Sequence, residues 1–210
     1  YKKFIKNLKL EKMINIYETF EKPLIQILAL MEIKGVEIDS KFLKSLSSKF
    51  EKKIFKLEKE IFKISKKEFN IASPKQLGEI IYNDLKIAGL KKTKKGSFAT
   101  SASVLEDLAF KGHEFPKLIL DWRQVSKLKN TYSDALPEHI NPNTKRVHTS
   151  FLLAATTTGR LASSDPNLQN IPIKSEDGKD IRKAFTAKKD HLLISADYNQ
   201  IEMRILADLA

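Results

Sequence analysis

Cysteine is absent from the 210 residues of this chain, so a disulfide framework and a thiolate metal site are both excluded. Long apolar runs are missing too: the longest candidate, residues 24–31, contains Gln26 and falls far short of the roughly 20 residues that cross a bilayer. No targeting segment is visible. These absences predict a chain with no membrane partner and fit a reducing compartment. Because the chain begins at Tyr1 and ends within an apolar pattern, we expect it to be an excised piece of a longer protein.

Basic residues outnumber acidic ones by 38 to 26, which gives a net charge of +12. This excess favours a polyanionic partner, because clustered Lys and Arg gain affinity by releasing counterions from phosphates. A lysine-rich coding bias would give the same composition. Only five of the basic residues are arginine, and all of them lie beyond residue 122, where a rigid planar fork would matter. The 41% hydrophobic content suffices for a buried core in one or two domains.

Apolar residues recur at helical spacing through most of the first half of the chain. A first helix is expected over residues 13–34, with Gly35 as its C-cap, and a second from Asp39 or Ser40 to about Ile64. Ser73, Pro74 and Gln76 form a capping-box start. Further helices are expected over residues 74–86, from Thr100 or Ser101 to about Gly112, and from near Pro116 to Tyr132, with a basic loop over residues 91–96. Everything up to about residue 136 is therefore expected to be helical.

The pattern changes after Pro137 and the turn-rich residues 141–144. Short β-type segments follow over residues 147–151 and 191–196. We therefore predict the α+β fold class, in which a mostly helical part precedes the beginning of an antiparallel-sheet domain. That sheet is expected to be completed by residues outside this chain.

The apolar segment 192–196 ends at Asp197, and helical spacing resumes through Ile201, Ile205 and Leu209. A strand here would present Asp197 at the rim of a sheet. An aspartate in this position more often caps a helix or makes a turn. Asp197 could instead be a metal ligand, but phosphoryl transfer with two metal ions needs at least two carboxylates, and this chain shows only one plausible member. Glu202 is either a second ligand, a residue that shapes the pocket, or an exposed helix glutamate.

Residues 197–204 (DYNQIEMR) closely resemble the first catalytic palm motif of the family A DNA polymerases, the family of bacterial polymerase I. The resemblance extends to other segments in the same order and spacing. These are residues 158–172 (TGRLASSDPNLQNIP), 181–185 (IRKAF), 146–150 (RVHTS), 127–132 (KLKNTY) and 73–77 (SPKQL). It thus covers nearly the whole chain and is most specific from residue 123 onward.

The resemblance implies a role for each residue of the palm motif. Asp197 would bind both catalytic Mg²⁺ ions, assisted by the backbone carbonyl of Tyr198. Glu202 would be the steric gate that fills the space of a ribose 2′-hydroxyl. Ile201 would floor the nucleotide pocket, and Gln200 would lie close to the primer terminus. A second carboxylate is not found here, so this chain by itself is expected to bind DNA without extending a primer.

The resemblance also implies contacts with the primer–template duplex. Arg160, Asn167, Gln169 and Asn170 would read the minor groove, Arg123, Lys127, Lys129, Asn130 and Thr131 would contact phosphates, and Arg182 would contact either DNA or a carboxylate. Lys174 stands where relatives often carry arginine, which keeps the charge but loses the bidentate geometry. The alternatives from composition alone are a turn-rich connector over residues 163–170 and a solvated helix end over residues 123–131.

The expected organisation is a connector with a lead-in helix over residues 1–22, a helical thumb over residues 23–140 and the first part of a palm over residues 141–210. The expected function is template-directed addition of deoxynucleotides to a primer, in replication or repair. The partners would be primer–template DNA and deoxynucleoside triphosphates, with a monomer in the bacterial cytoplasm and nucleoid or in an organellar nucleoid. A non-catalytic nucleic-acid-binding module is the alternative, and Glu202 disfavours a related single-subunit RNA polymerase.

Overall fold

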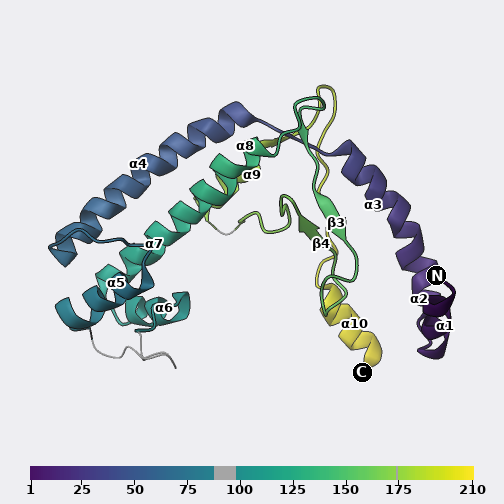
Figure 1. The fold of residues 1–210 in the computed structure, drawn as a ribbon, viewed down its shortest axis with the longest axis horizontal. Helices are drawn as coiled ribbons and strands as arrows, with labels where there is room; N and C mark the ends of the chain where they lie inside the picture. The colour runs from purple at the N-terminus through teal and green to yellow at the C-terminus, as the bar shows by residue number, and fades with distance from the viewer. Residues whose placement is uncertain (88–97, 174) are drawn as a thin grey trace.

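The computed structural model describes residues 1–87, 98–173 and 175–210, and its ribbon forms an arch (Figure 1). The basic loop expected over residues 91–96, and Lys174, lie outside the described residues. Helices with two small antiparallel sheets confirm the α+β fold class. Among the described residues, none of the helices combines the length and the apolar character needed to cross a bilayer.

One side of the arch is the N-terminal helical stretch. It comprises α1 (Lys2–Leu10), α2 (Ile14–Ile16), the π-helical η1 (Tyr17–Glu21) and α3 (Lys22–Lys34). The helix predicted over residues 13–34 is thus confirmed, and it ends at Gly35, which has φ +59° and donates its N–H to the carbonyl of Met31. A Cβ at Gly35 would lie 2.7 Å from the carbonyl oxygen of Val147. Glycine therefore serves both the backbone turn and the close approach of a later segment.

A short strand, β1 (Val36–Ile38), follows α3, so the expectation of helix alone up to residue 136 is wrong here. It pairs antiparallel with β2 (Arg146–Val147) and β5 (Phe185–Thr186) in the order β2-β1-β5. Three residues are too few to show a period of two. Both partners lie more than 100 residues further along the chain, so no local pattern announces the pairing.

The other side of the arch is an arm of two long helical stretches, seen side by side in Figure 1. The first is α4 (Ser40–Ser65), and the second is α7 (Glu114–Leu128), continued by the π-helical η3 (Lys129–Asp134) and by α8 (Ala135–Glu138). Asp39 caps α4 by accepting from the N–H of Phe42 at 2.9 Å, as predicted. The two stretches run antiparallel, because Ser47 bonds Asp134 near one end while Glu58 accepts from Trp122 further along.

The far end of the arm is a separate packing unit. It contains α5 (Pro74–Glu79), the π-helical η2 (Ile80–Asp84) and α6 (Ala102–Phe110), which bury their own apolar cluster against α4 and α7. Ser73 caps α5 by accepting from the N–H of Gln76 at 3.4 Å, as predicted. The predicted capping box is only half formed, because the Gln76 side chain accepts from the N–H of Asn70 instead of Ser73.

The base of the arm and the sheet share one hydrophobic cluster. Ile38, Leu43, Leu46, Phe50, Val125, Leu128, Tyr132, Leu136, Val147, Ile181 and Ala184 are its buried members. Two of them, Ile181 and Ala184, come from α9 (Glu176–Arg182) and the turn that follows it. The cluster therefore spans the predicted boundary at residue 140, and packing is continuous from the arm into the sheet.

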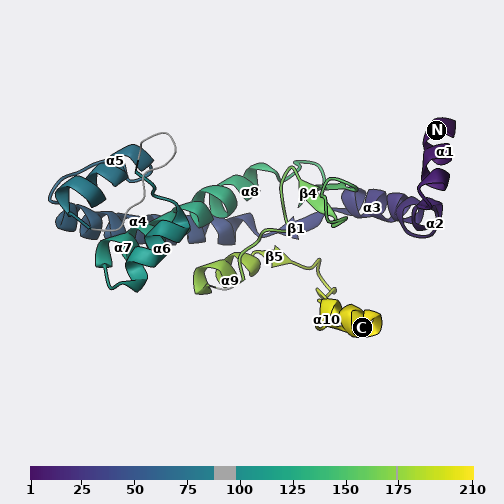
Figure 2. The ribbon, with the colours of Figure 1, turned by 90° about the horizontal axis from the view of Figure 1, so that it is seen from below.

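The predicted strand over residues 191–196 is not formed, which corrects the sequence analysis. In the part of the chain that the structure describes, no strand pairs with this segment, and its apolar side chains are exposed, with Leu192 at 89% and Ile194 at 91%. A strand needs a partner for its backbone groups. The predicted helix after Asp197 is confirmed as α10 (Ile201–Leu209). Figure 2, which views the arch edge-on, shows α9 and α10 on the same face of it.

Ion pairs add to the contact between α4 and α9. Lys49 of α4 lies 2.8 Å from Asp180 of α9, and Lys53 of α4 pairs with Asp177 of α9. Lys183, at the end of α9 itself, lies 2.7 Å from the Asp180 carboxylate. Hydrogen bonds from Lys183 and Lys49 lower the pKa of Asp180 to about 2. A carboxylate whose pKa is depressed by folding stabilises the native state only while it is ionised.

We predict that Asp180→Asn lowers the free energy of unfolding near pH 6 by up to about 1 kcal/mol, the range of exposed ion pairs. The pKa falls from 3.8 to about 2 on folding, so this contribution is present above pH 4 and is lost as the pH falls toward 2. Urea unfolding at pH 6 and pH 2.5 measures it, with the exposed Glu60→Gln of α4 as a control. A deficit of equal size at both pH values would contradict the prediction.

Candidate functional site

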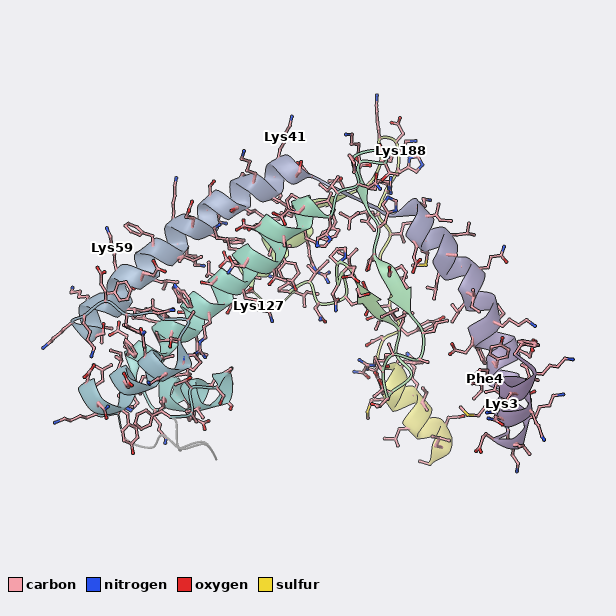
Figure 3. All side chains as sticks on the ribbon, in the orientation of Figure 1. Lys3, Phe4, Lys41, Lys59, Lys127 and Lys188 are labelled. Carbon is pink, nitrogen blue, oxygen red and sulfur yellow. The ribbon has the colours of Figure 1, made fainter. Side chains whose placement is uncertain are left out.

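A cleft of about 700 Å³ separates α7 from the loop that precedes α9. Lys127 lies on the α7 side, and Gln169 and Asn170 lie on the loop side. The full lining is Gln124, Lys127, Leu128, Tyr132, Gln169, Asn170, Ile171, Pro172, Ile173 and Ser175. Figure 3 places Lys127 on the inner side of the arch, whereas Lys41 and Lys59 lie on its outer side. The fold thus brings together two sets of predicted contact residues that lie about 40 positions apart in the sequence.

The two walls of this cleft are joined by Tyr132. Its ring is buried in the cluster at the base of the arm, and its hydroxyl donates to the backbone carbonyl of Asn170. Burial raises the pKa of Tyr132, so the hydroxyl keeps its proton for this bond. In the sequence, Tyr132 was the last residue of an apolar stripe and of the motif segment 127–132, with no partner predicted for its hydroxyl. The available signal was that a buried tyrosine hydroxyl needs a polar partner.

The loop over residues 161–170 is held by its own hydrogen bonds. The Gln169 side chain donates to the carbonyl of Leu161 at 3.0 Å, and the Asn167 side chain accepts from the N–H of Gln169 at 2.9 Å. Asn167, Gln169 and Asn170 nevertheless remain exposed, as does Arg160. The loop therefore has an ordered turn structure and also presents a row of polar side chains outward.

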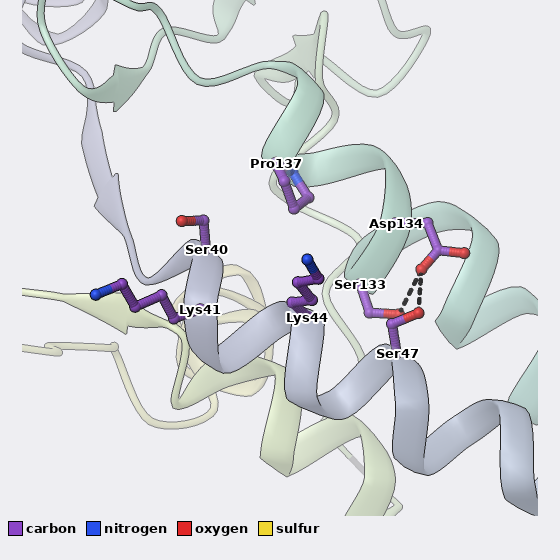
Figure 4. A pocket seen from close by; sticks show the side chains of 7 residues that line it. All are labelled: Ser40, Lys41, Lys44, Ser47, Ser133, Asp134 and Pro137. Atoms are coloured by element: carbon purple, nitrogen blue, oxygen red, sulfur yellow. Dashed lines mark hydrogen bonds between the residues drawn. The ribbon is translucent and has the colours of Figure 1, made fainter.

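The π-helical turn η3 carries three of the predicted phosphate contacts. Asn130 and Thr131 are exposed, whereas the ammonium of Lys129 lies 2.7 Å from Asp134. Figure 4 shows Asp134 also accepting from Ser47 and Ser133. Burial tends to raise the pKa of Asp134, but hydrogen bonds from Lys129 and Ser47 outweigh it and hold the pKa below its usual value. Lys129 is thus partly committed to an internal ion pair.

Arg123 has an internal partner as well. Its guanidinium donates to the carbonyl of Thr100 at 2.7 Å, which ties α7 to the start of α6. Burial lowers its pKa. The arrangement favours a structural role at the far end of the arm, and the phosphate contact stays a prediction. Arg182, in the last turn of α9, is exposed.

Arg160 and Glu202 come together across two motif segments, 42 positions apart. A guanidinium nitrogen of Arg160 lies 3.8 Å from a carboxylate oxygen of Glu202, with both side chains largely exposed. Gln200, with φ +52°, precedes α10 as its N-cap, and Ile201 begins the helix with a partly exposed side chain. The residues predicted for the nucleotide pocket therefore lie together at the start of α10, with Arg160 beside them.

Asp197 and Tyr198 lie on the exposed segment that leads into α10. Over residues 1–87, 98–173 and 175–210, the Asp197 carboxylate makes no hydrogen bond or ion pair, and no three acidic or histidine side chains gather at one place. A free carboxylate beside a backbone carbonyl is a suitable oxygen donor set for one side of a Mg²⁺ site. The donors present fit such an ion but do not complete its coordination.

Comparison with known protein families matches residues 40–210 to the family described as DNA polymerase family A. DNA polymerase I of Rhizobium leguminosarum is 52% identical over 93% of this chain and 19% of the relative. DNA polymerase I of Caldicellulosiruptor bescii is 47% identical over 93% of this chain and 23% of the relative. The chain therefore spans about a fifth of the length of these curated relatives.

The fold is also similar to a solved structure, the POL domain of Pol1 from M. smegmatis in complex with DNA primer-template and dNTP. The TM-score is 0.86 at 36% sequence identity, over 97% of this chain and 36% of the other. A likeness at this identity and coverage extends through the arm, the sheet and α10.

We predict that Tyr132→Phe lowers the free energy of unfolding by about 1 kcal/mol, because the Asn170 carbonyl loses its donor while the ring still packs. Urea unfolding measures the loss. Tyr82→Phe is the matched control, since that ring stacks on Phe98 at 4.3 Å and is partly exposed. Equal losses in the two variants would show that the Tyr132 hydroxyl has no special role.

Proposed function

Because this chain belongs to DNA polymerase family A, we propose that it forms the thumb and the first part of the palm of a template-directed DNA polymerase. The arm would be the thumb within residues 23–140, and residues 141–210 would begin the palm, with residues 1–22 as a connector. The longer protein would add deoxynucleotides to a primer. This activity belongs to the whole polymerase, of which the chain is one part.

The observation that carries the proposal is the cleft between α7 and the loop at residues 169–173. Lys127 supplies a positive charge on one wall, and the amides of Gln169 and Asn170 supply donors and acceptors on the other. A duplex needs both kinds of contact: phosphate contacts position it without regard to sequence. The minor groove presents purine N3 and pyrimidine O2 acceptors at every correct pair, so amide donors there sense pair geometry.

The exposed row of Arg160, Asn167, Gln169 and Asn170 extends the same surface. With a net charge of +12, the chain would be drawn to a polyanion by a force that weakens with salt. Lys127, Asn130 and Thr131 would hold phosphates, with lesser contributions from Lys129, Arg123 and Arg182. The first two of these lesser contributors are already engaged inside the protein.

The catalytic part of the proposal rests on the segment that begins α10. The family's reaction is metal-dependent, and the Asp197 carboxylate and the Tyr198 carbonyl would hold Mg²⁺ there, with a second carboxylate from outside this chain. Bound Mg²⁺ would activate the primer 3′-hydroxyl and neutralise charge on the phosphates. Asp197 would also orient this hydroxyl. Gln200 would lie near the primer end, and Ile201 would pack under the nucleotide.

Glu202 would act as the gate against ribonucleotides. Its carboxylate, 3.8 Å from Arg160, would occupy the space that a 2′-hydroxyl needs. The family match favours this role over a single-subunit RNA polymerase and over a binding module without catalysis. We further propose a monomer that acts in the bacterial cytoplasm and nucleoid or in an organellar nucleoid, in replication or repair.

We predict that Lys127→Ala weakens binding of this chain to primer–template DNA and reduces the slope of log K against log[salt] by about 1, because one phosphate contact is lost. Lys59→Ala removes the same charge on the outer side of the arm and should leave the slope unchanged. Fluorescence anisotropy at several salt concentrations measures both. Equal slopes for the two variants would argue that the lysine excess is compositional and that the cleft does not bind DNA.

We also predict that Glu202→Ala in the full-length protein raises ribonucleotide incorporation relative to deoxynucleotide incorporation by at least about tenfold, the scale of removing one close steric conflict. Single-nucleotide extension with matched ribo- and deoxynucleoside triphosphates measures the ratio. Glu202→Asp, which keeps the charge but shortens the side chain, should give an intermediate ratio. An unchanged sugar preference in the alanine variant would refute the gate.

A further inference from the structure

Two buried hydroxyl groups lie behind the exposed row of polar side chains on the loop. Thr149 is 5% exposed and Ser163 is 4% exposed. The hydroxyl oxygen of Thr149 lies 2.6 Å from that of Ser163, 2.8 Å from the carbonyl oxygen of Pro166 and 3.0 Å from that of Ser164. The backbone N–H of Leu168 donates to Ser163 at 3.1 Å. One hydroxyl pair therefore contacts the loop backbone at three points.

The directions of these bonds follow from the chemistry of the groups. A carbonyl oxygen only accepts, so the Thr149 hydroxyl must donate to a carbonyl, and Pro166 is the nearer one. Ser163, which accepts from Leu168, can then donate to Thr149 at 2.6 Å or to the carbonyl of Pro166 at 3.3 Å, and Thr149 is the nearer acceptor. The result is a directed chain of hydrogen bonds from Leu168 through Ser163 and Thr149 to Pro166. In a buried place each of these bonds is costly to lose.

This chain of hydrogen bonds lies directly behind Asn167, one of the residues proposed to contact the minor groove. Pro166 and Leu168 are the neighbours of Asn167 on either side, and both are held by the hydroxyl pair. Asn167 in turn accepts from the N–H of Gln169, whose side chain donates to Leu161. Thr149 is buried and lies between β2 and β3 (Ser150–Leu152). It therefore supports the loop at residues 161–170 from a different segment of the chain.

We propose that Thr149 is a positioning residue that sets the direction of Asn167 and Gln169 toward the minor groove. This inference rests on the proposed function and extends it to a residue that touches neither DNA nor nucleotide. The hydroxyl of Thr149 holds Pro166 directly and Leu168 through Ser163, so that the backbone on both sides of Asn167 is fixed before DNA arrives. Preorganised donors contribute more to recognition than donors that must be ordered on binding.

The test compares the variants Thr149→Val and Thr149→Ser in the full-length protein. Valine keeps the shape and removes the hydroxyl, whereas serine keeps the hydroxyl. The probe is a primer that ends in guanine or in 3-deazaguanine, which lacks the N3 acceptor of the minor groove. The measured quantity is the rate of single-nucleotide extension on the guanine primer divided by the rate on the 3-deazaguanine primer. This ratio reports the contact with the N3 atom and not the general stability of the variant.

The wild-type protein is expected to extend the guanine primer at least about fivefold faster, the effect of one hydrogen bond of about 1 kcal/mol. Thr149→Val should reduce the ratio to near 1, and Thr149→Ser should restore it. Thr100→Val is the matched control, because Thr100 is 7% exposed and precedes α6 in the arm. That control should keep the wild-type ratio.

Each outcome decides one question. If the wild-type protein shows the expected ratio and Thr149→Val shows the same ratio, the positioning role is overturned and the proposed function is left intact. A ratio near 1 in the wild-type protein overturns minor-groove reading, and the role of Thr149 with it. If Thr149→Val fails to fold by circular dichroism, Ser163→Ala takes its place, since it breaks the same chain at the next hydroxyl. An unchanged ratio in that variant would then refute the proposal.

Discussion

The structure depends on a single shared hydrophobic cluster at the base of the arm. The cluster contains Ile38 of β1, Phe50 of α4, Val147 of β2, Ile181 of α9 and Ala184 after it. These elements therefore exclude water from one common core. Close packing of this kind resists small shifts, because each displaced side chain loses contacts on several sides. The two walls of the cleft are anchored in this one core through Tyr132. The width of the cleft is therefore set by packing in this cluster.

The polar site divides into a supported part and an exposed part. The loop at residues 161–170 is fastened by buried hydroxyls, by its own side chains and by Tyr132. The segment from Leu192 to α10 lies beyond the core, and its apolar side chains are solvent-exposed in this chain. In the proposed polymerase, the duplex contacts would come largely from this chain. Metal binding at Asp197 would need further ligands from outside it, since the chain spans about a fifth of its relatives' length.

The sequence predicted what depends on near neighbours. Helix periodicity and the caps at Gly35, Asp39 and Ser73 are local properties, and all of them are confirmed. The contact of Arg160 with Glu202 was not predicted, because it joins two segments 42 positions apart and depends on the tertiary fold. Strand β1 was missed and a strand at residues 191–196 was wrongly expected, because a strand exists only with a partner. A buried tyrosine hydroxyl indicates that some polar partner exists, but the sequence could not name the partners of Arg123 and Tyr132, since both are backbone carbonyls set by the tertiary fold.

The number of residues in the π-helical turn η3 decides which face of α7 points into the cleft. A π-helical turn holds an extra residue compared with an α-helical turn, and here it lets Lys129 pair with Asp134, five positions away. Loss of one residue between 129 and 134 would restore an α-helix and rotate everything before it by about 100° relative to α8. Lys127 would then leave the cleft while its charge and its helix remained. Single-residue deletions in this turn are thus expected to be more damaging than most substitutions, because they change which face of α7 lines the cleft.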